Sequence, residues 1–266
     1  MIVNSLGFRT DLFFSSFAGE IIERDSYLVV RDSSNPTWHH GNFLLFSHPP
    51  RMGDLDRWQK LFAHEMGQAI PRCHYAFGWD TITGELGQIQ PFLDKQYNVD
   101  IYSIMTTGVI KTPPKLNSTL VTRQLTQDWE WEGALQNQVS CRNPIYGLEG
   151  YIGYRRHMMR MYRQMSEQGD GAWFGAFFGD RVVGDLGVFV RNGLGRFQSV
   201  GTHPDFRRQG ICSTLVYQAA LYAFSNFDAK ILVIAADQND YAYRIYESIG
   251  FSLTEQQVWL TWWEQN

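Results

Sequence analysis

The chain has 266 residues, 44% of them hydrophobic and 19% charged, and a net charge of -4 at pH 7. This composition predicts the packed core of one large domain or two small ones and excludes a disordered chain. The acidic balance gives no general attraction to nucleic acid or to an anionic membrane, so we expect neither as a partner. No apolar run reaches the ~18 residues of a membrane span. The first residues, Met1–Leu6, lack the basic start and long apolar run of a signal peptide, so we expect a cytoplasmic protein.

Residues 1–118 predict a mixed α/β domain. Strands are expected where short β-branched or aromatic runs are bounded by turn residues, and helices where apolar residues recur at helical spacing. The expected strands are Ser26–Arg31, Gly41–Phe46, His74–Trp79 and Val99–Thr106, and the expected helices are Leu55–Met66 and Leu86–Tyr97. Pro113 and Pro114 then interrupt both kinds of element, so we predict a domain boundary near residue 118.

Residues 119–266 predict a second domain built around an antiparallel sheet. Strands are expected at Thr119–Leu125, Ala172–Phe178, Arg181–Val190 and Arg196–Thr202, and helices at Thr126–Gln138 and Glu149–Glu167. Glycine beside Asp180 or Asn192 is typical of hairpin turns, which makes the last three strands antiparallel. A helix over Arg208–Ser225 followed by the apolar run Ile231–Ala235 predicts a parallel crossover. A helix over Asn239–Ile249 and a strand over Val258–Trp263 follow.

The loop before the Arg208–Ser225 helix has the features of a phosphate site. Pro204 ends the preceding strand, because proline cannot donate to a ladder. The first turn of the helix has unpaired N–H groups and the positive end of the helix dipole, which together bind phosphate. Gly210 lets the backbone come close to a ligand, and Arg207 and Arg208 add charges that suit phosphate oxygens. A nucleotide-binding P-loop is disfavoured, because no Lys-Ser/Thr pair follows Gly210.

Two blocks in this order resemble the GCN5-related N-acetyltransferase superfamily. The loop Arg207-Arg208-Gln209-Gly210-Ile211-Cys212 resembles its Gln/Arg-x-x-Gly-x-Gly/Ala motif, and Thr202-His203-Pro204 resembles the strand end before it. The segment Asn239–Phe251 reproduces a frequent Asn-x-x-Ala-x-x-x-Tyr-x-x-x-Gly-Phe ending. The resemblance implies an α/β acyl-CoA N-acyltransferase fold, a mixed and mostly antiparallel sheet flanked by helices. Residues 1–118 are then either a degenerate copy of this fold, as in tandem-module members, or an unrelated α/β extension.

The resemblance also implies acetyl-CoA as co-substrate and an N-acetyltransferase activity. Backbone groups near Val200, Gly201 and Thr202 would bind the pantetheine arm. The pyrophosphate would lie on the loop, whose residues are Arg207, Arg208, Gln209, Gly210, Ile211, Cys212 and Ser213. Asn239 matches a position that often touches the cofactor, and it could instead cap its helix. Tyr246 matches the tyrosine often proposed to protonate the departing thiolate.

Two positions depart from the family pattern. Cys212 replaces the usual glycine or alanine but is still small. Arg196 occupies the position that carries an acidic base in some relatives, so the base stays open between Asp185, Asp237 and a chain of water molecules. The amine must be neutral to attack the thioester, so one of these must take its proton. Covalent catalysis by Cys212 is a further alternative.

A metal site is not expected. Cys73, Cys141 and Cys212 are few and widely spaced, which argues against zinc and against a disulfide framework. The histidines of the first half have no spacing typical of a metal site either: they are His39, His40, His48, His64 and His74.

The sequence leaves open whether the acceptor is a small-molecule amine or a peptide amine. It also leaves open whether the protein is a monomer or a homodimer. The acidic and aromatic run Trp129–Glu132 suits a cationic amine or is a solvated helix face. A non-catalytic acyl-CoA-binding or regulatory module is the competing function.

Overall fold

The computed structural model describes residues 1–36, 38–67 and 74–263. It divides into two compact units, the first comprising Met1–Ile104 with Leu253–Asn266 and the second Met105–Ser252. The sequence predicts one boundary near residue 118. In the structure the chain passes into the second unit within its fifth strand and returns to the first unit for its last strand. Cys73 lies outside the described residues.

The first unit is a sheet with helices on its faces. Its elements are α1 (Leu6–Ala18), β1 (Glu20–Glu23), β2 (Tyr27–Arg31), η1 (His39–Gly41), β3 (Phe43–Phe46), α2 (Asp54–Met66), β4 (His74–Trp79), α3 (Gln90–Leu93), β5 (Asn98–Thr107) and β11 (Ser252–Trp263). The strand order is β1-β2-β3-β4-β11-β5. Strands β3 and β4 are parallel, whereas β1–β2, β2–β3 and β4–β11 are antiparallel.

Side chains of this sheet are buried on both faces. Because successive residues of a strand point to opposite faces, β2 and β3 supply two separate cores. Leu28, Val30, Phe43 and Leu45 cluster with Phe8 of α1. Val29, Leu44 and Phe46 cluster with Trp58 and Phe62 of α2, and the rings of Phe46 and Trp58 stack with their centres 3.9 Å apart.

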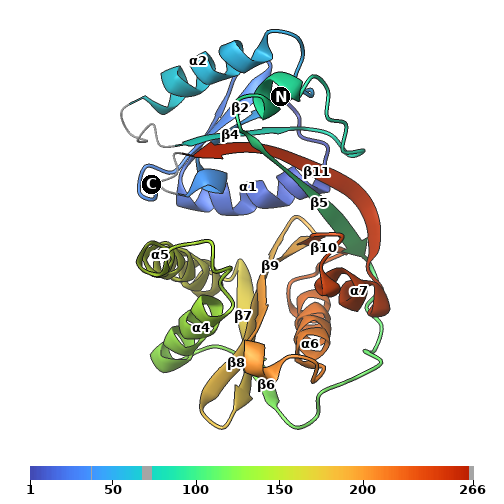
Figure 1. The fold of residues 1–266 in the computed structure, drawn as a ribbon. Helices are drawn as coiled ribbons and strands as arrows, with labels where there is room; N and C mark the ends of the chain where they lie inside the picture. The colour runs from blue at the N-terminus through green and yellow to red at the C-terminus, as the bar shows by residue number, and fades with distance from the viewer. Residues whose placement is uncertain (37, 68–73, 264–266) are drawn as a thin grey trace. The chain divides into compact units, whose positions relative to one another are not determined.

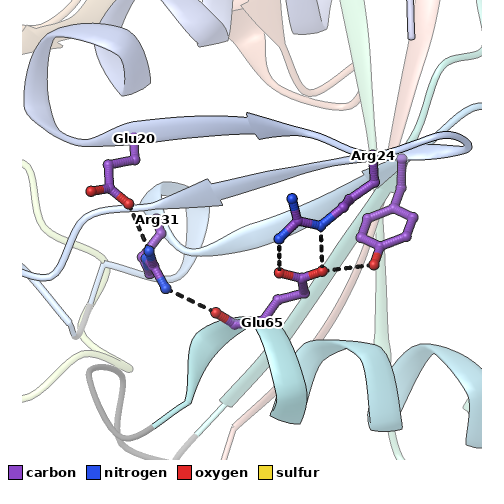
Figure 2. A network of polar contacts seen from close by, with 5 residues as sticks. Glu20, Arg24, Arg31 and Glu65 are labelled. Atoms are coloured by element: carbon purple, nitrogen blue, oxygen red, sulfur yellow. Dashed lines mark hydrogen bonds and ion pairs between the residues drawn. The ribbon is translucent and has the colours of Figure 1, made fainter.

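An ion-pair network fastens the end of α2 to the β1–β2 hairpin (Figure 2). Glu65, which is buried, accepts from Nε and Nη2 of Arg24 at 2.8 Å each and from the hydroxyl of Tyr27 at 2.8 Å. Arg31 donates to the backbone oxygen of Glu65 and to the carboxylate of Glu20. The pKa of Glu65 is lowered, chiefly by the hydrogen bonds from Arg24.

The second unit has helices on both faces of its own strands. Its elements are β6 (Val121–Gln124), α4 (Asp128–Ser140), α5 (Leu148–Glu167), β7 (Gly171–Phe178), β8 (Arg181–Arg191), β9 (Leu194–Thr202), η2 (Pro204–Phe206), α6 (Ile211–Asn226), β10 (Ile231–Ala236) and α7 (Tyr241–Ser248). The order β10-β9-β8-β7-β6 is antiparallel except for β9 and β10, which are parallel. Figure 1 shows α4 and α5 on one side of these strands and α6 on the other.

Strand β8 lies between these helix layers and packs against both. A Cβ on Gly184 would lie 2.8 Å from Ile211 of α6, so glycine lets this helix come close. The next residue, Asp185, points to the opposite face and meets Asn137 and Gln138 of α4. Positions 184 and 185 therefore fix the two helix layers that flank the strand.

The predicted fold class is confirmed, and most predicted elements are present within a few residues of their expected bounds. The expected helix over Leu86–Tyr97 is wrong, because only Gln90–Leu93 is helical. The residues before it form a non-helical loop instead: the backbone oxygen of Glu85 accepts from the Trp79 indole, and Gln88 N donates to the backbone oxygen of Pro50. Helix α1 and strand β1 were not predicted. No helix in the described residues is both long and apolar enough to cross a membrane.

Candidate active site

A pocket opens in the second unit where β9 and β10 diverge. The register of the two strands runs from Ile231 opposite Leu194 to Val233 opposite Arg196, and β9 then continues to Thr202. Beyond this point a pocket of about 260 Å³ lies between the strands and the start of α7. Its lining includes Gln198, Ser199 and Val200 of β9, Ala236 of β10, Asp237 and Tyr246. Of the predicted arm-binding residues, Val200 lines this pocket, and Gly201 and Thr202 follow it on the same strand.

Strand β9 is irregular at the pocket. Ser199 has a φ of 51°, and the pairing with β8 shifts register between Asp185 and Gly187. Positive φ is costly for a residue other than glycine, so the surroundings must hold this conformation. Gln138 Nε2 donates to the backbone oxygen of Ser199 at 2.7 Å, and Arg155 Nη1 donates to its hydroxyl at 2.9 Å.

Hydrogen bonds to Asp185 of β8 stabilise the same region of the sheet. Its fully buried carboxylate accepts from Asn137 Nδ2 at 2.5 Å, from Gln138 Nε2 at 2.9 and 3.0 Å, and from Trp173 Nε1 at 2.9 Å. Burial raises its pKa to about 6, although the three donors favour the charged form. Both oxygens are therefore engaged in joining α4 to β7 and β8, and Asp185 is poorly placed to take a proton from an incoming amine.

The predicted phosphate loop starts a long helix. Arg208 and Gly210 have φ values of 64° and 77°, and α6 begins at Ile211. The hydrogen bond from Thr214 N to the backbone oxygen of Gly210 is the first of the helical type. The amides of Ile211, Cys212 and Ser213 precede it and lie at the positive end of the helix dipole.

A segment before β6 holds this loop from the side. Lys115 Nζ donates to the backbone oxygen of Arg208 at 2.6 Å, and Asn117 Nδ2 donates to that of Gln209 at 2.9 Å. A Cβ on Gly210 would lie 2.5 Å from the backbone oxygen of Lys115, so this close approach requires glycine. Sequence reasoning missed Lys115 and Asn117, because the neighbouring Pro113-Pro114 pair pointed only to a domain boundary.

Basic side chains gather near the loop. Arg207 is exposed and directs its Nε to the backbone oxygen of Thr202 at 3.3 Å, while the Arg208 side chain is exposed. Arg181 Nη2 lies 2.8 Å from His203 Nε2. The loop and its surroundings therefore combine positive charge with the free amides of a helix start.

Tyr246 is buried and lines the pocket, and Cys212 at the start of α6 is partly buried and close enough to affect its electrostatics. Burial raises the pKa of Tyr246 well above 10, and Cys212 and Asp240 raise it further. Burial likewise raises the pKa of Cys212 to about 12, with Asp240 adding to the effect. Tyr246 is thus a neutral phenol at physiological pH, and Cys212 is a neutral thiol without the lowered pKa that a nucleophile needs.

The turn after β10 places two carboxylates at the pocket rim. Asp237 accepts from Asn239 N at 2.8 Å, and Asp240 caps α7 by accepting from Ala242 N. The interpretation of Asn239 as the helix cap is therefore wrong by one residue. Asn239 itself is exposed next to the pocket-lining Asp240.

The run Trp129–Glu132 does not form a continuous acidic and aromatic patch. Glu130 is buried, accepts from the amides of Thr126 and Gln127 and pairs with Arg123. Trp131 is buried and packs against Trp173, whereas Trp129 and Glu132 are exposed.

Comparison with known proteins agrees with this arrangement. A protein from Staphylococcus epidermidis of unknown function superposes with a TM-score of 0.71 at 11% identity, covering 93% of this chain and 95% of that one. A GCN5-related N-acetyltransferase from Kribbella flavida gives 0.65 at 14% identity, with 97% and 95% covered. A tandem GNAT protein from the clavulanic acid biosynthesis pathway gives 0.53 at 14% identity, with 84% and 76% covered. The chain therefore has the acyl-CoA N-acyltransferase fold, and the similarity includes its N-terminal half.

The sequence itself matches one family model. Residues 140–251 match the model of the acetyltransferase (GNAT) family, so this part of the chain is a GNAT domain. No curated protein sequence is similar enough to the chain to count as a match. The matched range includes the β9–β10 pocket, the loop before α6, and Tyr246.

Proposed function

We propose that the protein is an acetyl-CoA-dependent N-acetyltransferase that moves an acetyl group to a primary amine by direct attack in a ternary complex. One observation carries the proposal. Within the GNAT domain, the pocket between β9 and β10 lies beside a loop whose helix-start amides and arginines suit a pyrophosphate.

The residues present fit acetyl-CoA. The backbone of Val200, Gly201 and Thr202 would bind the pantetheine arm, because β9 continues beyond its register with β10. The amides from Gln209 to Ser213 would bind the pyrophosphate, with charge from Arg207 and Arg208, and Asn239 would contact the cofactor at the pocket rim. Gly210 supports this assignment, because its left-handed backbone and its contact with Lys115 shape the turn that opens these amides.

Acetyl-CoA would supply a thioester to the neutral amine. The amine nitrogen bonds to the acetyl carbon as the carbon–sulfur bond breaks, the nitrogen loses one proton and the thiolate gains one. Backbone N–H groups near Val200 and Gly201 would stabilise the developing oxyanion.

Tyr246 is the proposed proton donor to the leaving thiolate. It lines the pocket, and its raised pKa keeps the hydroxyl protonated. Among the described residues, the hydroxyl of Tyr246 donates no hydrogen bond to another protein group, so its proton can point toward the thiolate. Of the two carboxylates considered for the base, Asp237 is the better placed, because it is exposed and lines the pocket whereas Asp185 is fully buried.

The test is a thiol-release assay with acetyl-CoA and a panel of primary amines. We expect turnover with at least one amine and a fall in kcat of about 100-fold in Tyr246→Phe, within the usual range for a general acid. Tyr241→Phe is the matched control, because Tyr241 lies on the same helix and is 70% exposed. Acetyl-CoA binding without thiol release from any amine would favour the non-catalytic module instead, and lack of binding would reject both.

A further inference from the structure

Arg155 of α5 lies next to the irregular part of β9. Its Nη1 donates to the hydroxyl of Ser199 at 2.9 Å, and its Nε donates to the hydroxyl of Tyr151 at 3.2 Å. Ser199 lines the pocket described above. The guanidinium is thus fixed beside the strand residue at which β9 bends, on the face of the sheet that carries α4 and α5.

The charge of Arg155 has no direct counter-ion. Across the residues that the structure describes, no carboxylate lies within ion-pair distance of the guanidinium, and Nη2 has no acceptor. The positive charge of Arg155 favours the charged form of Asp185, but three other donors already occupy that carboxylate. A half-buried arginine with neutral partners alone is unusual, because desolvation of a charge is normally offset by a paired charge.

Tyrosine rings surround the guanidinium and hold it in place. The rings of Tyr151 and Tyr154 lie 5.7 and 5.6 Å from its central carbon. Their π-faces favour a cation, and the pKa of Tyr154 is raised by burial, so its phenol stays neutral. Arg155, Tyr151, Tyr154 and Ser199 are all half-buried, which leaves part of the group open. Rigid aromatic walls with one unpaired nitrogen make a preorganised site for an anion.

We propose that Arg155 binds the carboxylate of the acceptor, so that the acceptor is an amine that also carries a carboxylate, with free amino acids as the simplest members. The inference rests on the proposed acetyl transfer and adds its substrate class. The two unpaired N–H groups of Nη2 would donate to the carboxylate, while the amine of the same molecule faces the pocket beyond Ser199. Arg155 is then a specificity-determining residue that touches substrate and takes no part in the proton transfers.

The test compares each amino acid with the amine that lacks only its carboxylate, for aliphatic, aromatic and cationic side chains. Thiol release is measured with acetyl-CoA, and binding of each compound to the CoA-saturated protein is measured by calorimetry. We expect kcat/KM to be about 100-fold higher for the preferred amino acid than for its decarboxylated partner, the scale of a buried charge-assisted pair. Arg155→Gln should remove that preference by lowering kcat/KM for the amino acid alone.

Arg156→Gln is the matched control, because Arg156 is the next residue of α5 and is exposed. It removes the same charge and should leave the preference intact. If Arg155→Gln lowers turnover of both members of a pair equally, Arg155 only supports the bend at Ser199 and the proposal is wrong. If no amine releases thiol, the proposed function fails by itself. Calorimetry then tests separately whether Arg155 binds a carboxylate. Binding of amino acids that is lost in Arg155→Gln supports the proposal, and absence of binding to the wild type overturns it.

Discussion

Gly210, before α6, and Gly53, before α2, have the same left-handed backbone conformation, with φ values of 77° and 83°. Each lies between a strand and a helix, and each helix leads into a strand parallel to the first. The flanking sequences also correspond, since His48-Pro49 precedes Gly53 as His203-Pro204 precedes Gly210. The first unit therefore repeats the strand–loop–helix–strand arrangement of the second, which agrees with its inclusion in the structural matches and favours the degenerate copy over an unrelated extension.

The two units differ at the positions where a cofactor would enter. In the first unit β3 and β4 stay in register up to Phe46 opposite Trp79, the last residue of each strand. At the start of α2 the buried carboxylate of Asp54 accepts from Arg51 N and from Arg57 Nε at 2.8 Å each. The start of this helix thus already carries a carboxylate, and its ion pair with Arg57 occupies a charge that a phosphate would use.

We therefore predict that one chain binds one acetyl-CoA. Calorimetric titration of the whole protein should give a stoichiometry near one, with no second, weaker phase. A second bound cofactor per chain would show that the loop before α2 is still functional.

Gly210→Ala should weaken acetyl-CoA binding. The new Cβ would lie 2.5 Å from the backbone oxygen of Lys115, and alanine is strained at this φ. We expect a loss of about 1–3 kcal/mol in stability and a higher KM for acetyl-CoA. Gly53→Ala is the control, because φ is similar but no atom lies within 4 Å of its Cβ. It should lose only about 1 kcal/mol and keep its KM; equal cofactor effects in the two variants would contradict the role given to Lys115.

Glu65→Gln should destabilise the first unit. The change removes one acceptor oxygen and the charge from the contact with Arg24 and Tyr27, at a cost of about 1–2 kcal/mol after allowing for the partly exposed arginine. Because the native pKa of Glu65 is lowered from 4.5, this stabilisation is present above pH 4.5 and is lost as the pH falls further. Denaturant unfolding at pH 7 and pH 3 measures both effects. Glu20→Gln, whose carboxylate is 63% exposed, should cost under about 0.5 kcal/mol.

Local sequence patterns predicted the elements that carry the candidate site. The apolar run Ile231–Ala235 and the hairpin glycines at 179 and 193 have direct physical consequences for the backbone, so β7 to β10 were predicted closely. Helix α1 was missed although Gly19 ends it, because its apolar residues are not confined to one regular stripe.

Contacts between distant residues were beyond prediction. The loop residues Arg207–Ser213 are contiguous, so a motif could reveal them together. The contact of Lys115 with Arg208 and that of Arg155 with Ser199 join segments far apart in the chain, and no local spacing encodes them. The same holds for Asp185, whose three partners come from α4 and β7.

Cys212 should be unreactive in the native protein. Burial raises its pKa to about 12, so almost no thiolate forms at pH 8. We expect slow alkylation by iodoacetamide until the protein is unfolded. Mass spectrometry of the protein incubated with acetyl-CoA, without amine, should show no acetyl adduct. An adduct on Cys212 would replace direct attack by a covalent route.

Asp185 should make the protein more stable as the pH falls from 6 to 4, against the usual trend for a carboxylate. Its native pKa is raised by burial to about 6 from 3.8, so the folded state binds the proton more tightly than the unfolded state does. The favourable contribution is complete below pH 3.8 and is lost as the pH rises through 6, a change of about 3 kcal/mol.

Asp185→Asn cannot titrate, so the difference in unfolding free energy between wild type and variant isolates this group from all other carboxylates. We expect that difference to shift in favour of the wild type by about 2.4 kcal/mol between pH 7 and pH 4, most of the full change. A shift of the opposite sign would mean that the donors from Asn137, Gln138 and Trp173 outweigh burial and hold the carboxylate charged.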